Sequence, residues 1–146
     1  MAEKLALTVQ YASRLHNLPD EADFRLWAVR ALDRPAEITV RIVNAAEGRN
    51  LNSAFRGKDY ATNVLTFVYH APRAKKLQGD LVLCAPVVAR EAREQKKLLH
   101  DHYAHLVVHG LLHLAGYDHE NTSDAAKMEK REIAILTALD IANPYL

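Results

Sequence analysis

Three histidines lie within residues 109–119, which read HGLLHLAGYDH. His109 and His113 are four residues apart, so on a helix they would share one face. Gly116 has no Cβ and can adopt the left-handed conformation that ends helices, which would turn the chain back and bring His119 toward the same point. Three imidazoles around one ion leave a coordination position for water, as in catalytic zinc sites. We therefore predict one Zn²⁺ bound by His109, His113, His119 and a water.

The neighbouring His105 continues the four-residue spacing but is not predicted to bind the same ion. From His105 to His113 a helix rises about 12 Å, whereas zinc–nitrogen bonds are only about 2.0–2.1 Å long. We expect His105 to pack, or to form a hydrogen bond near the metal. We expect His100 and His102 to be polar residues at a helix start. Cys84 is predicted to be a buried apolar residue and not a ligand.

The residue after the first histidine limits the chemistry. The same histidine spacing occurs in the metzincin proteases, whose motif HExxHxxGxxH places the general base directly after the first ligand. Here that position is Gly110. The sequence therefore keeps the metal spacing but lacks the proton acceptor of ordinary peptide hydrolysis. Bound zinc can still lower the pKa of water to about 7 without that carboxylate.

The composition is that of a globular protein, with 49% hydrophobic and 25% charged residues in a chain of 146. We expect a single domain over residues 1–146, with no membrane helix and no signal peptide. One cysteine cannot form an internal disulfide, which is compatible with a cytoplasmic location. The net charge of +1 argues against a polybasic nucleic-acid binder, but residues 73–97 carry an excess of Lys and Arg that could attract an anionic partner.

Hydrophobic periodicity places the elements that would position these residues. Alternating or β-branched stretches predict strands at residues 5–11, 37–44, 62–69 and 80–84. Helices are predicted at about 20–34, 45–55, 86–99, 101–115 and 123–140, with Asn44, Asp101 and Ser123 as N-caps. Without strict alternation of strand and helix, this order indicates an α+β single domain with a mixed four-stranded sheet and about five helices.

Two longer segments resemble a known family. HGLLHLAGYDHE, at residues 109–120, resembles the signature of the YbeY family of bacterial ribosomal-RNA maturation ribonucleases, including the glycine after the first histidine. FRGKDYATNVLTF, at residues 55–67, is similar to the RGKDxxTxVLSF segment of that family, and residues 79–81 resemble its GD(I/L) strand start. The order and gaps fit from about residue 37 to 136. Asn63 and Thr66 stand where the family often has Asp and Ser.

The resemblance implies a zinc-dependent, single-strand-specific endoribonuclease. The family role is maturation of the 3′ end of 16S rRNA, ribosome biogenesis and ribosome quality control. The implied partners are single-stranded RNA, the small ribosomal subunit, a small-subunit ribosomal protein and an Era-type GTPase, with no membrane or DNA. Arg56 corresponds to the arginine that the family places near the metal, where a guanidinium could hold phosphate oxygens through two hydrogen bonds. Lys58 and residues 73–97 could guide the RNA backbone.

Two other functions stay open on the sequence. A zinc metallopeptidase-like hydrolase would share the metal spacing, and a ribosome-assembly module without catalysis would use the metal for structure. The nucleophile could be hydroxide or a ribose 2′-hydroxyl. Asp59, Asp80 and Asp118 are carboxylates that could reach the site, and no proton shuttle is assigned among them.

Overall fold

The structure is a computed structural model, and it describes residues 4–117 and 121–146. Within these residues the elements are β1 (Leu5–Tyr11), α1 (Glu21–Ala31), β2 (Ala36–Val43), α2 (Ala45–Arg56), β3 (Val64–Val68), β4 (Leu77–Cys84), α3 (Ala85–Glu94), α4 (Leu99–Leu114) and α5 (Thr122–Ala138). The predicted fold class is confirmed, because four strands form one mixed sheet that packs with five helices in this part of the chain. None of the described helices is long and apolar enough to cross a membrane.

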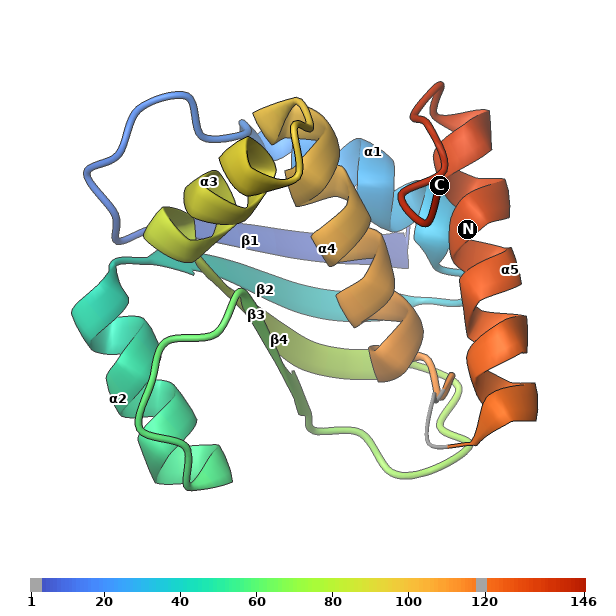
Figure 1. The fold of residues 1–146 in the computed structure, drawn as a ribbon. Helices are drawn as coiled ribbons and strands as arrows, with labels where there is room; N and C mark the ends of the chain where they lie inside the picture. The colour runs from blue at the N-terminus through green and yellow to red at the C-terminus, as the bar shows by residue number, and fades with distance from the viewer. Residues whose placement is uncertain (1–3, 118–120) are drawn as a thin grey trace.

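The sheet has the strand order β1-β2-β4-β3. The first three strands in this order run parallel, and β3 pairs antiparallel with β4 at one edge. Helix α4 lies across the strands, with α5 beside it (Figure 1). Helix α4 also contacts β3, the antiparallel edge strand of the sheet.

Buried side chains form one cluster on each face of the sheet. Ile38, Val40 and Leu81 point to the face that α1, α4 and α5 cover. Val82 and Cys84 point to the other face, where a smaller cluster packs against α2. This alternation follows from the two-residue period of a strand. Cys84 is buried, as expected from the sequence.

Helix α4 approaches the sheet closely at two glycines. A Cβ on Gly110 would lie 2.7 Å from Leu81 Cδ2, and one on Gly79 would lie 2.2 Å from Leu114 Cδ1 and 2.4 Å from the Phe67 carbonyl oxygen. These distances are shorter than packed carbon atoms allow. The position after His109 therefore faces the core, which explains why the glutamate of the protease motif has no place there.

Several strand and helix boundaries differ from the prediction by a few residues, among them the start of β4 and the end of α3. β4 begins at Leu77, three residues earlier than expected, because residues 77–79 pair with residues 36–38 of β2. Helix α3 ends at Glu94 and not near residue 99. The chain leaves the helix at Lys96, whose φ of 55° is left-handed, and the Lys97 N–H donates to the Ala92 carbonyl.

Two predicted N-caps are also wrong. The N-cap of α4 is Leu98, and the helix begins at Leu99. Asp101 lies inside the first turn, where the negative charge of its carboxylate interacts favourably with the positive end of the helix dipole. Helix α5 is capped by Asn121 and not by Ser123, because the Asn121 side chain accepts from the Asp124 N–H at 2.8 Å. Asn44 caps α2 as predicted, by accepting from the Glu47 N–H.

Candidate metal centre and groove

A groove of about 1110 Å³ runs between α4 and the edge strand β3. Its walls are residues 62–69 around β3, Phe55 and Arg56 at the end of α2, the three histidines of α4 at positions 105, 109 and 113, and Tyr145 near the C-terminus. Two of the predicted metal ligands, His109 and His113, therefore line the same groove as Arg56, the arginine predicted to bind phosphate. These residues are far apart in the sequence, and the packing of α4 on the sheet brings them together.

The end of α4 has the predicted glycine turn. Gly116 has a φ of 107°, in the left-handed region. The Tyr117 N–H donates to the Leu112 carbonyl and the Gly116 N–H donates to the His113 carbonyl, both at 3.0 Å, which is the hydrogen-bond pattern of a Schellman motif. His119 and Asp118 lie outside the described residues, so convergence of the third histidine stays a prediction.

His109 and His113 are neighbours on one face of α4, as their spacing predicts. Their ring centroids lie 4.9 Å apart with an interplanar angle of 79°. Both side chains are half-buried and both line the groove. The pair could contribute two nitrogen ligands to one ion at the groove wall.

A buried carboxylate that the sequence reasoning missed lies behind these rings. Glu132 of α5 is 0% exposed. Its Oε1 accepts from His109 Nδ1, and its Oε2 accepts from the Tyr145 hydroxyl and from His105 Nε2, the last at 3.3 Å. The expectation that His105 forms a hydrogen bond close to the predicted metal site agrees with this contact. A signal was present in the sequence, because Glu132 shares the apolar face of its helix with Met128, Ile135 and Leu136.

The hydrogen bonds keep Glu132 ionised despite its burial. Burial by itself raises the pKa of this carboxyl, but the hydrogen bonds from His105, His109 and Tyr145 outweigh it and hold the pKa at about 2. Burial and the contact with Glu132 raise the pKa of the Tyr145 hydroxyl, so this group stays protonated and donates. Glu132 is therefore a buried anion surrounded by donors.

Two sets of side chains could hold a metal, and His109 belongs to both. Among the described residues, ligand atoms of His105, His109 and Glu132 all lie within 4.8 Å of one another, so this buried trio could bind an ion. The predicted set is His109, His113 and His119, of which the first two line the groove. The sets differ in chemistry, because the trio includes Glu132, a carboxylate that solvent does not reach, whereas the predicted set consists of histidines alone.

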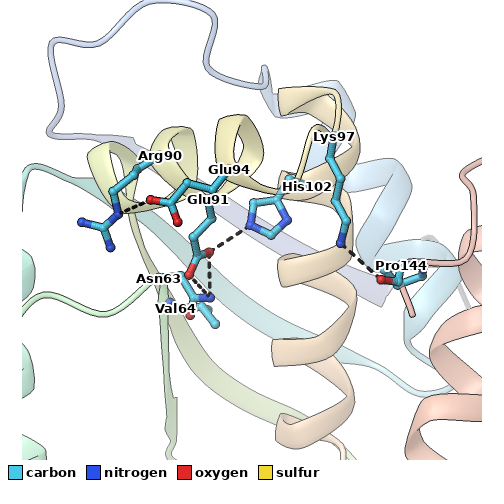
Figure 2. Close-up of polar contacts among 8 residues, drawn as sticks. All are labelled: Asn63, Val64, Arg90, Glu91, Glu94, Lys97, His102 and Pro144. Atoms are coloured by element: carbon cyan, nitrogen blue, oxygen red, sulfur yellow. Dashed lines mark hydrogen bonds and ion pairs between the residues drawn. The ribbon is translucent and has the colours of Figure 1, made fainter. Parts of the chain in front are cut away.

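His102 lies in the first turn of α4, at a helix start as expected, but it is buried. It is 3% exposed, and its Nε2 donates to Glu91 Oε1 at 2.9 Å. Asn63 Nδ2 donates to the same carboxylate at 3.0 Å, and Asn63 Oδ1 accepts from the Val64 N–H (Figure 2). This network joins α3 and α4 to the start of β3. The amide at position 63, where the resembled family often has Asp, can donate to Glu91, which a carboxylate could not.

The network predicts a pH-dependent stability. Burial lowers the pKa of His102 more than its contact with Glu91 raises it. The unfolded chain therefore binds a proton at His102 below the ordinary pKa of 6.5 that the folded chain does not, so acid lowers the free energy of unfolding. Between about pH 7.5 and 5.5, wild type will lose more stability than His102→Gln, by up to about 1.4 kcal/mol per pH unit. Urea unfolding of both proteins at each pH measures this difference, and parallel curves would contradict it.

Arg56 ends α2 at the groove, and Gly57 turns the chain away with a φ of 68°. The other predicted polar residues have different surroundings. Asp59 forms a two-point ion pair with Arg49, at 2.7 and 2.8 Å, and Asp80 accepts from the Tyr69 hydroxyl at 2.8 Å. Lys58 and the basic residues of 73–97 are outside the described groove lining.

The fold and the groove together define an α+β protein in which helix α4, packed on the sheet, presents histidines to a groove beside an arginine. A family model described as Endoribonuclease YbeY matches residues 10–140. A protein of that name from Thiobacillus denitrificans is 56% identical over 145 residues, covering 99% of each chain. One from Nitrosomonas eutropha is 54% identical over 140 residues, covering 96% of this chain and 98% of its own.

A solved structure is also similar. The solution structure of a Thermotoga maritima protein has a TM-score of 0.57 and 26% identity, over 92% of this chain and 91% of that one. The chain belongs to the Endoribonuclease YbeY family. The resemblance found in the histidine and arginine segments is thereby confirmed.

Proposed function

We propose that this protein is a zinc-dependent endoribonuclease that cuts single-stranded RNA, with His109, His113 and His119 as the metal ligands. The observation that carries the proposal is the groove, which places two histidines of α4 in the same cavity as Arg56. Membership of the Endoribonuclease YbeY family supports the reaction class. Maturation of the 3′ end of 16S rRNA and ribosome quality control in the cytoplasm, with ribosomal and GTPase partners, are part of the same proposal.

The donor chemistry of the groove fits a zinc ion. His109 donates from Nδ1 to Glu132, which puts the lone pair of the neutral ring on Nε2, the nitrogen that would bind the ion. Imidazole suits zinc, although nickel, copper and iron also bind it. When bound, the ion would supply Lewis-acid polarisation of a phosphate and lower the pKa of water.

The remaining groove residues suit RNA. Arg56 would hold the phosphate oxygens that gain negative charge as the phosphodiester is attacked. Phe55 and Tyr69 line the same cavity and are 65% and 63% exposed, so their rings are accessible to unpaired bases, which stack on aromatic faces. Duplex RNA keeps its bases stacked inside, which favours a single strand as substrate.

A peptidase is the less favoured alternative. Its mechanism needs a carboxylate general base beside the metal. Position 110 faces Leu81 and Thr66 of the sheet, with no room for a glutamate side chain that could reach the groove. Phosphodiester cleavage does not depend on that residue, because the charge of the metal and of Arg56 would stabilise its transition state.

Metal removal tests the proposal on the wild-type chain. Purified protein is expected to contain one zinc per chain, to cut a single-stranded RNA faster than the same sequence in a duplex, and to lose this activity after chelation. Returning Zn²⁺ should restore cleavage. The product ends identify the nucleophile, because a 2′,3′-cyclic phosphate forms only when the ribose 2′-hydroxyl attacks.

Other outcomes would favour the alternatives. Unchanged cleavage after complete metal removal would refute the metal-dependent mechanism. Peptide hydrolysis without RNA cleavage would favour the peptidase. If chelation unfolded the chain, and the zinc-loaded protein bound small subunits but cut no RNA, the metal would be structural.

A further inference from the structure

Glu132 requires an explanation, because burying a carboxylate away from water is unfavourable unless it is fully hydrogen-bonded. The side chain lies on the buried apolar face of α5, and Glu132 is 0% exposed. Three donors from two other parts of the chain meet on it: His105 and His109 from α4, and Tyr145 from the C-terminal segment. A hydrophobic residue at this position would pack without needing any of them.

We infer that Glu132 is a positioning residue that orients His109 for metal binding, which rests on the ligand set proposed above. Metal-binding histidines generally donate their second ring N–H to a carboxylate or carbonyl, which fixes the tautomer and the ring orientation. Glu132 Oε1 accepts from His109 Nδ1 in this way. The ring is thereby held with Nε2 as the ligand nitrogen.

The second oxygen of Glu132 is held independently of His109. Oε2 accepts from His105 Nε2 and from the Tyr145 hydroxyl. The Tyr145 ring also packs edge-on against the His105 ring, with centroids 5.6 Å apart at 83°. With His109, His113 and His119 as the ligands, His105 acts on the carboxylate and not on the ion. Because both oxygens are engaged, Glu132 cannot rotate away from His109 without breaking several hydrogen bonds.

The C-terminal segment is part of this arrangement. Lys97 Nζ donates to the Pro144 carbonyl at 3.3 Å, directly before Tyr145 (Figure 2). The Tyr145 N–H donates to Asn143 Oδ1 at 2.8 Å. These contacts hold the tyrosine at the groove, where it is one of the lining residues and its hydroxyl donates to the buried carboxylate. Residues 143–145 therefore help to hold the carboxylate that accepts the hydrogen bond from His109.

Zinc affinity tests the inference without relying on activity. Competition with a chromophoric chelator measures the zinc dissociation constant of the full chain, and circular dichroism checks its fold. Glu132→Gln keeps the shape of the side chain but removes the charge, and is expected to weaken zinc binding about 10- to 100-fold. Tyr145→Phe should weaken it less, in the same direction. The matched control is Glu94→Gln on α3, whose exposed carboxylate pairs with Arg90, and it should bind zinc as wild type does.

Cobalt absorption adds a readout that a purely structural role would not change. The visible bands of Co²⁺ bound to Glu132→Gln should differ from those of wild type, because the ligand ring is held less firmly. Wild-type zinc affinity and cobalt spectrum in a folded Glu132→Gln protein would overturn the inference. If that variant does not fold, Tyr145→Phe decides, since the inference fails if its zinc affinity is unchanged.

The failure of this inference can be told apart from failure of the proposed function. A folded Glu132→Gln variant with normal affinity, beside a His113→Ala variant that has lost its zinc, would overturn the positioning role alone. Retention of zinc by His113→Ala with loss in His105→Ala would instead make His105, His109 and Glu132 the ligands, and would overturn both.

Discussion

Replacing His113 with alanine is expected to abolish zinc binding and RNA cleavage while the fold is retained. The side chain is half-buried at the groove wall, and alanine is the best helix-forming residue, so α4 should persist. Without His113 only two proposed ligands would be left. Loss of the ion removes several kcal/mol of transition-state stabilisation, so cleavage should fall at least about 1000-fold. Metal analysis and an RNA cleavage assay on the same preparation measure both effects.

His105→Ala is the matched control, because it removes an imidazole from the same helix four residues before the first ligand. This variant should still carry one zinc per chain at saturating metal, with a smaller loss of affinity than Glu132→Gln, since His105 contacts Glu132 and is not among the proposed ligands. Cleavage and zinc in His113→Ala at wild-type levels would contradict the proposed site. Residual cleavage that is equal in all variants would instead reveal a contaminating nuclease.

The part of this site that the sequence predicted is the part that local rules determine. A four-residue spacing places His109 and His113 together on any helix, and Gly116 ends that helix because a left-handed φ suits glycine. Alternation at residues 5–11 and 37–44 and β-branched or aromatic composition at 62–69 predict strands, and these signals are equally local. The segment similarity added Arg56, whose approach to the histidines depends on the packing of α2, β3 and α4 and could not be derived from spacing.

The residues that were missed or misplaced depend on tertiary contacts. Glu132 and Tyr145 are 13 positions apart and meet only because the chain folds back after α5. His102 stands in a polar segment that is typical of a helix start. Its burial depends on Glu91 of the preceding helix, which accepts a hydrogen bond from its ring. β4 extends to Leu77 because β2 offers it a partner there, which no local preference reveals.

Gly110 shows how packing and chemistry are linked in this protein. Its missing side chain lets α4 lie close to Leu81, and the same absence removes the general base of the protease motif. The close packing of α4 on the sheet at Gly110 positions its histidines beside the edge strand β3. The negative charge of a phosphodiester transition state is stabilised by cations and not by such a base, and Arg56 is the one Arg or Lys in the described groove lining.

Reversing the charge of Arg56 should therefore reduce cleavage strongly without affecting the metal. In Arg56→Glu a carboxylate would face the phosphate that the guanidinium is proposed to hold. Loss of one such stabilising donor lowers rates by about 100- to 1000-fold, and repulsion adds to this. Zinc content should match wild type and the fold should be retained, because Arg56 is not a proposed ligand, is exposed at the end of α2 and contributes to neither core cluster.

Arg30→Glu provides the matched control for this charge reversal. Arg30 is also an exposed arginine in the last turn of a helix. Both variants therefore change the net charge equally, and both place a negative charge at the negative end of a helix dipole. It lies on α1, outside the described groove lining. Equal loss of activity in the two variants would mean that general electrostatic attraction of RNA was measured. Loss confined to Arg56→Glu, at unchanged zinc content, would place the guanidinium beside the reacting phosphate.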